Sequence, residues 1–103
     1  FFDGRTPFLI YSEEDPRRIV LRRMRPDLMA TEGDAVELIR PTESWERGCT
    51  EAPTLLKRGG KYHLIYSGGW FQSSKNESSY CVAHAVAPKL TGPYTKTGQI
   101  LTG

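Results

Sequence analysis

Residues 59–67, GGKYHLIYS, are the stretch that decides the fold, because a similar stretch, GRTPFLIYS, occurs at residues 4–12. Two more pairs of segments recur in the same order, residues 19–28 with 81–90 and residues 36–39 with 98–101. The second copy differs from the first by a longer loop between its strands. Three ordered matches indicate an internal repeat better than a chance similarity does.

Each recurring segment is predicted to be a β-strand. Residues 8–11, 19–24 and 62–66 are rich in β-branched and aromatic residues and are bounded by turn-forming residues. The Gly59-Gly60 pair supplies the positive φ angles that a tight hairpin needs, and Asp3-Gly4 offers the same chemistry in the first copy. The pattern therefore favours β-hairpins and gives little support to helix.

The second copy has the pattern of a four-stranded meander. Its strands are expected at residues 50–57, 61–67, 80–87 and 99–102, with a long loop at residues 68–79. Repeated four-stranded antiparallel units are typical of β-propeller blades. We therefore predict an all-β fold of two four-stranded antiparallel blades, one in residues 1–41 with most of its first strand missing and one in residues 42–103. The repeat alone also permits a small two-sheet sandwich.

Two blades cannot close a propeller by themselves. Their uncovered sheet edges and faces predict that the chain is a piece of a longer protein, incomplete on its own, or that several copies associate to complete the ring. The composition, with 38% hydrophobic and 25% charged residues, is that of an ordinary globular domain. A net charge of +2 does not favour nucleic acid as a partner, and Arg17-Arg18 is interpreted as solvated surface. No apolar run approaches the roughly 20 residues that span a bilayer, so no membrane segment is expected.

Glu51 is the acidic residue that we single out. It precedes Ala52-Pro53 at the start of an apolar strand, and the innermost strand of a propeller blade lines the central channel. Partial burial there would raise the pKa of the carboxyl group toward neutrality, as a general acid requires. The alternative is that Glu51 is solvated or paired with a lysine or arginine, as most isolated glutamates at strand starts are.

Candidate sugar contacts cluster after the second strand of the second copy. Ser67 and Gly68 lead into Trp70 and Phe71, and glycines beside exposed aromatic rings suit a sugar-binding platform. An ordinary loop that packs its aromatic side chains explains the same pattern. Trp45 is a further candidate for stacking on a sugar ring, or else a core tryptophan.

Metal-binding and nucleophilic chemistry find little support. His63 and His84 have no cysteine or carboxylate neighbours at metal spacing, so we predict no metal site and no cofactor. Cys49 and Cys81 are predicted to be small buried hydrophobic residues, because no local motif pairs either with a base.

Four motifs, taken together, resemble glycoside hydrolase family 43, the five-bladed propeller arabinanases, arabinofuranosidases and xylosidases. They are Trp45-Glu46, residues 51–55 (EAPTL), residues 60–69 (GKYHLIYSGG) and residues 92–94 (GPY). The resemblance spans nearly the whole chain and implies that it corresponds to about the third and fourth blades. The family's general acid is the glutamate of the E-A/G-P strand, and this role carries over to Glu51.

The resemblance also implies that two of the family's three catalytic carboxyl groups have no match in this chain. The family inverts configuration and uses three carboxyl groups, an aspartate base, an aspartate that tunes the acid, and the glutamate acid. Only the acid matches a position in this chain, and the family's cation-associated histidine would likewise lie outside it. A working site would then need a second carboxylate, from Asp3 or from another copy.

The expected function is therefore that of an inverting glycosidase acting on arabinose- or xylose-containing plant cell-wall polysaccharides, with Glu51 as the acid. Its partner would be an oligo- or polysaccharide. The alternative is a non-catalytic carbohydrate-binding or self-assembling module that uses Trp70, Phe71 and Trp45 as stacking surfaces.

Overall fold

The structure is a computed structural model, and it describes residues 1–69 and 80–102. The first sheet has the strand order β1-β2-β3-β4, all antiparallel. Its strands are β1 (Phe2–Asp3), β2 (Thr6–Glu13), β3 (Arg18–Arg23) and β4 (Val36–Ile39). Strand β1 comprises two residues and pairs with the start of β2.

The second sheet has the order β5-β6-β7-β8 and is also antiparallel throughout. Its strands are β5 (Thr50–Arg58), β6 (Lys61–Gly68), β7 (Cys81–Ala87) and β8 (Thr95–Thr102), and a 3₁₀ turn, η1 (Ser44–Glu46), precedes them. The prediction of two four-stranded antiparallel units is confirmed. Among the described residues, no helix has the length and apolar character needed to cross a membrane.

The hairpin between β5 and β6 follows the chemistry of its two glycines. Gly59 has φ 60° and Gly60 has φ 74°, and the strands on either side pair Arg58 with Lys61. Two consecutive positive φ angles define a type I′ turn, whose twist matches that of the flanking strands. The register of β5 against β6 is thereby set at the turn and carried along the strand to Glu51.

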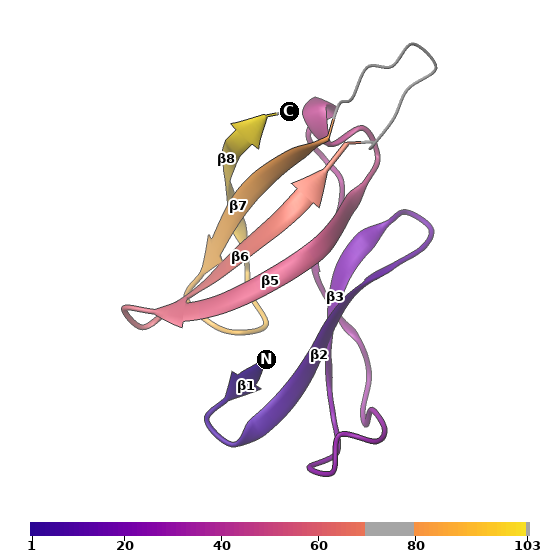
Figure 1. Cartoon of the computed structure of the whole chain (residues 1–103), viewed down its shortest axis with the longest axis vertical. Helices are drawn as coiled ribbons and strands as arrows, with labels where there is room; N and C mark the ends of the chain where they lie inside the picture. Colours follow the sequence, from indigo (N-terminus) through magenta and orange to yellow (C-terminus); the bar gives the residue numbers. More distant parts are fainter. Residues whose placement is uncertain (70–79, 103) are drawn as a thin grey trace.

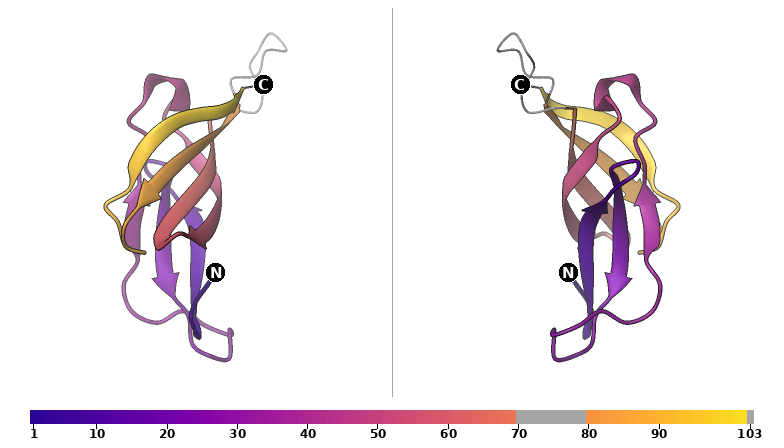
Figure 2. Two further views of the ribbon diagram at one scale, coloured as in Figure 1. Left: turned by 90° about the vertical axis from the view of Figure 1, so that its left-hand side faces the viewer. Right: turned by 90° about the vertical axis from the view of Figure 1, so that its right-hand side faces the viewer.

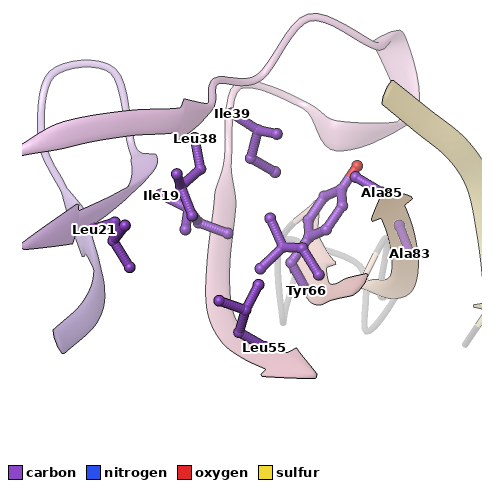
Figure 3. Packing of buried hydrophobic residues seen from close by; sticks show 9 residues of the cluster. Ile19, Leu21, Leu38, Ile39, Leu55, Tyr66, Ala83 and Ala85 are labelled. Atoms are coloured by element: carbon purple, nitrogen blue, oxygen red, sulfur yellow. The ribbon is translucent and has the colours of Figure 1, made fainter. Parts of the chain in front are cut away.

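The two sheets pack on one another through a shared core. Strand β2 lies beside β5, and the side views show the sheets as two layers (Figures 1 and 2). Both sheets contribute side chains to the cluster between them (Figure 3): Ile19, Leu21, Leu38 and Ile39 from the first, and Leu55, Leu64, Tyr66, Ala83 and Ala85 from the second. Each fully buried large aliphatic side chain contributes roughly 1.5–3 kcal/mol relative to an exposed one.

The connection between the sheets is fixed by a buried carboxylate, that of Glu46 in η1. Its side chain is 0% exposed. Oε1 accepts hydrogen bonds from Lys96 Nζ (2.8 Å) and from the backbone N–H groups of Thr42 (2.8 Å) and Glu43 (2.9 Å), and Oε2 accepts one from the Tyr66 hydroxyl (2.7 Å). Burial alone would raise the pKa of Glu46, but these donors, Lys96 foremost, lower it below its usual value.

Candidate active site around Glu51

Glu51 is presented by an irregular stretch of β5. Thr50 pairs with Gly68 and Glu51 with Ser67, but the register then shifts before Thr54 pairs with Ile65. Ala52, between the regular pairs, has φ 50°, which is a left-handed conformation that residues with a Cβ rarely adopt. Pro53 follows and cannot donate to the ladder. The E-A-P sequence therefore forms a bulge, a device that redirects a neighbouring side chain.

Because the backbone at Ala52 is strained, we expect a β-branched residue at this position to destabilise the fold. Ala52→Val should lower the free energy of unfolding by about 1–3 kcal/mol, because a branched Cβ clashes further in the left-handed region. Urea unfolding of the variant measures the loss. The matched control is Thr54→Val in the same strand, at an exposed position with regular pairing. An Ala52→Val variant as stable as Thr54→Val would show that the bulge is unstrained.

Three donors within the described residues surround the Glu51 carboxylate. Oε1 accepts hydrogen bonds from Arg17 Nη1 (2.8 Å) and from Cys49 Sγ (3.0 Å), and Oε2 accepts one from the Tyr80 hydroxyl (3.1 Å). The side chain of Glu51 remains 27% exposed, so solvent or a ligand can reach it.

These donors lower the pKa of Glu51 below its usual value. The hydrogen bond from Cys49 has the largest effect; burial opposes it, and Arg17 and Tyr80 add to it. The expectation that burial would raise the pKa of Glu51 is wrong, because the hydrogen bonds from its donors lower the pKa by more than burial raises it. The carboxylate is paired with an arginine, which is the alternative that the sequence left open.

Arg17 is the contact of Glu51 that sequence reasoning missed. It was interpreted as solvated surface, but its guanidinium bridges Glu14 and Glu51, and only part of the side chain faces solvent. Arg18, beside it, pairs with Glu13 and Glu37 in the same way. The correction has a physical origin, since Arg17 reaches Glu51 only when the second sheet folds against the first. No spacing signal in the sequence announces that contact.

Both cysteines are free thiols and both are buried, as predicted. Burial raises the pKa of Cys49 to about 12, with the neighbouring Glu51 carboxylate adding to the shift. The thiol therefore stays protonated at neutral pH and acts as a hydrogen-bond donor to Glu51. Cys81 Sγ lies 3.6 Å from the Gly68 carbonyl oxygen. Neither thiol has the lowered pKa of a nucleophile.

The predicted sugar contacts lie in four different settings. Ser67 is buried opposite Glu51, where its side chain hydrogen-bonds Tyr80. Gly68 lies under η1, where an added Cβ would sit 3.3 Å from Glu46 Cγ and 3.4 Å from Trp45 Cζ3. Trp45 is half-buried and packs against the core. Trp70 and Phe71 lie outside the described residues, and sugar contact by any of these side chains stays a prediction.

Asp3, one suggested source of a second carboxylate, is engaged by side chains other than Glu51. It accepts hydrogen bonds from the Tyr62 hydroxyl (2.9 Å) and from Lys57 Nζ (3.3 Å). Lys57 lies six residues beyond Glu51 along β5, about 20 Å at the rise of a strand. The two carboxyl groups of an inverting glycosidase, by contrast, lie about 6.5–9.5 Å apart. The contacts of Asp3 thus hold it near the opposite end of β5 from Glu51.

The two histidines lie together, which their sequence separation did not suggest. His63 Nδ1 and His84 Nε2 are 3.0 Å apart, and His84 Nδ1 lies 2.7 Å from Thr97 Oγ1. Burial and the neighbouring His63 lower the pKa of His84. Within residues 1–69 and 80–102, no three His, Cys, Asp or Glu side chains gather in a way that would hold a metal ion.

Comparison with known proteins agrees with the fold and the motifs. The family model described as glycosyl hydrolases family 43 matches residues 1–102. A β-D-galactofuranosidase of Aspergillus niger is 32% identical over 79 residues, which cover 76% of this chain and 20% of that protein. The chain therefore spans about a fifth of this curated relative.

Solved structures match the chain closely. A thermostable family-43 glycoside hydrolase superposes with a TM-score of 0.84 at 28% identity, over 99% of this chain and 37% of that one. An endo-1,4-β-xylanase of Bacteroides thetaiotaomicron gives 0.81 at 31% identity, over 93% and 34% of the two chains. The two antiparallel sheets are thus blades of a β-propeller of the glycoside hydrolase class, as predicted. The chain belongs to glycosyl hydrolases family 43.

Proposed function

We propose that this chain is the acid-bearing part of an inverting glycoside hydrolase that acts on arabinose- or xylose-containing plant cell-wall polysaccharides. The observation that carries the proposal is the Glu51 carboxylate, presented by the bulge of β5 in a family 43 chain and 27% exposed. In this role Glu51 protonates the glycosidic oxygen while a base activates water on the opposite face of the sugar. We expect this base to come from outside the described residues, because the family's aspartate base matches no position in them.

Hydrolysis of aryl glycosides tests the proposal. The substrates are aryl α-L-arabinofuranoside, β-D-xyloside and, because one relative is named a β-D-galactofuranosidase, β-D-galactofuranoside. Proton NMR of the first-formed anomer distinguishes inversion from retention. Hydrolysis with inversion supports the proposal, and retention of configuration contradicts the mechanism.

A non-catalytic carbohydrate-binding module is the second candidate, and one observation favours it. The donors around Glu51 hold it as an anion, whereas a general acid must carry a proton. Titration calorimetry with arabino- and xylo-oligosaccharides separates the candidates. Binding that persists in Glu51→Gln and falls in Trp45→Ala, without hydrolysis by the unaltered protein, would favour the module.

We also propose that residues 1–41 and 42–103 are two separate blades, and that copies of the chain associate when no further blades cover them. Strands β1, β4, β5 and β8 are the edge strands of the two sheets, and an edge strand offers backbone groups with which another strand can pair. Light scattering of the 103-residue chain tests association, and a strictly monomeric mass would overturn it.

A further inference from the structure

The Arg17 guanidinium is held between two carboxylates from different parts of the chain. Nη1 donates to Glu51 Oε1 at 2.8 Å, Nε donates to Glu14 Oε1 at 2.8 Å, and Nη2 also donates to Glu14. Arg17 and Glu14 belong to the turn between β2 and β3 of the first sheet, whereas Glu51 belongs to β5 of the second. The contact therefore joins the two blades at the candidate acid.

The backbone of Arg17 is fixed independently of its side chain. Arg17 forms a parallel bridge with Cys49, and its carbonyl oxygen accepts hydrogen bonds from the backbone N–H (3.0 Å) and the hydroxyl (3.0 Å) of Thr50. In Figure 1 this turn lies beside the first residues of β5. A change of the side chain leaves these backbone bonds in place, so it removes the guanidinium without undocking the turn.

The distribution of donors makes the two carboxylate oxygens unequal. Oε1 faces the cationic guanidinium and the Cys49 thiol, while Oε2 faces the neutral hydroxyl of Tyr80. Protonating Oε1 would set its new hydrogen against two donors that already point at it. Protonation of Oε2 therefore costs less free energy than protonation of Oε1.

We propose that Arg17, clamped by Glu14, is a positioning residue for Glu51: it pairs with Oε1 from the neighbouring blade and thereby leaves Oε2 as the oxygen that carries the acid proton. The role of Glu51 as an acid rests on the proposed function. The pairing of Arg17 with Oε1 is a structural feature that does not depend on it. Among the described residues, the other groups that face the carboxylate are Cys49, just before β5, and Tyr80, just before β7; Ser67 on β6 hydrogen-bonds Tyr80.

The proposal predicts shifts of opposite sign for two substitutions. Arg17→Met removes the cation and should raise the titration midpoint of Glu51. Glu14→Gln removes the competing anion, so that Arg17 pairs more fully with Glu51, and should lower that midpoint. Arg17→Lys keeps the charge but loses the fork geometry, so its midpoint should lie between those of the unaltered chain and Arg17→Met.

Carbon-13 NMR titration of the Glu51 side-chain carboxyl in the 103-residue chain measures these midpoints. Arg18→Met is the matched control, because Arg18 is the adjacent arginine, is also ion-paired, and pairs with Glu13 and Glu37. A Glu51 midpoint in Arg17→Met equal to that in Arg18→Met overturns the proposal. If Arg17→Met does not fold, the shifts in Arg17→Lys and Glu14→Gln decide, and an unmoved midpoint in both overturns it.

Kinetics separate this proposal from the proposed function. If the protein is a glycosidase, the alkaline limb of kcat/KM moves to higher pH in Arg17→Met and not in Arg18→Met. Shifted NMR midpoints in a protein without hydrolytic activity would leave Arg17 as the positioning residue of Glu51 and would count only against hydrolysis by this chain. Activity that depends on Glu51, with an unmoved midpoint in Arg17→Met, would refute the role of Arg17 alone.

Discussion

Replacing Glu51 by glutamine should lower kcat for a substrate with a poor leaving group, such as a xylo- or arabino-oligosaccharide, by about 10²–10⁴-fold. The glutamine side chain has nearly the same shape and retains a carbonyl oxygen for the Arg17 and Cys49 donors. It cannot deliver a proton to the glycosidic oxygen. The loss therefore reports the acid chemistry and not a change in packing.

The size of this loss should depend on the leaving group. A dinitrophenol departs without much help from an acid, so a dinitrophenyl glycoside should lose far less rate in Glu51→Gln than the oligosaccharide does. Glu13→Gln is the control, because Glu13 is also ion-paired with an arginine but does not contact Glu51. Equal losses on both substrates would contradict the acid role, and so would an active Glu51→Gln variant.

The strands of the second blade were predictable because their signals are local. Gly59 and Gly60 specify the turn between β5 and β6, and the alternation along β7 buries every second residue from Cys81 to Ala87. Each of these features involves neighbours in sequence. Period-two patterns and turn residues carry enough information to place such strands.

The environment of Glu51 was not predictable in the same way. Its position in the E-A-P motif marked it as a candidate, but its donors come from residues 17, 49 and 80, which three different segments supply. The direction of the pKa shift depends on whether those donors outweigh burial. That balance is a property of the packed sheets, and the sequence contains no periodic signal for it.

Glu46 shows the same limit in the core. It appeared in the sequence only as the second residue of a Trp-Glu pair, with no sign that its side chain would be fully buried. Its partners Tyr66 and Lys96 lie 20 and 50 residues further along the chain. A charged residue is almost never buried without a partner, so the ion pair with Lys96 is a condition of this packing.

Lys96→Met should therefore be the most destabilising single change considered. Lys96 Nζ donates to Glu46 Oε1 (2.8 Å), to the Arg40 carbonyl oxygen (2.7 Å) and to Thr42 Oγ1 (2.8 Å), and its side chain is only 15% exposed. Removing it leaves the Glu46 carboxylate buried without its cation, which costs about 3–5 kcal/mol of unfolding free energy. Urea unfolding at pH 7 measures the loss. Lys89→Met, at an exposed turn position, is the control and should change stability by less than about 0.5 kcal/mol.

The pH dependence of the stability lost in Lys96→Met shows whether the buried Glu46 charge causes that loss. The folded-state pKa of Glu46 is lowered below its ordinary value of 4.5, so its ionised form contributes stability above that value, and the contribution is lost as the pH falls through the lower folded pKa. Lys96→Met removes the donor that lowers this pKa. The Glu46 carboxyl of the variant therefore takes up a proton at a higher pH than in the unaltered chain. The difference in unfolding free energy between the unaltered chain and Lys96→Met should therefore become smaller at acidic pH.

A double variant separates the buried charge from packing. Glu46→Gln combined with Lys96→Met should be more stable at pH 7 than Lys96→Met alone, because no unpaired charge remains. A gap that stays constant with pH, and a double variant no more stable than Lys96→Met, would attribute the loss to packing and not to the buried charge.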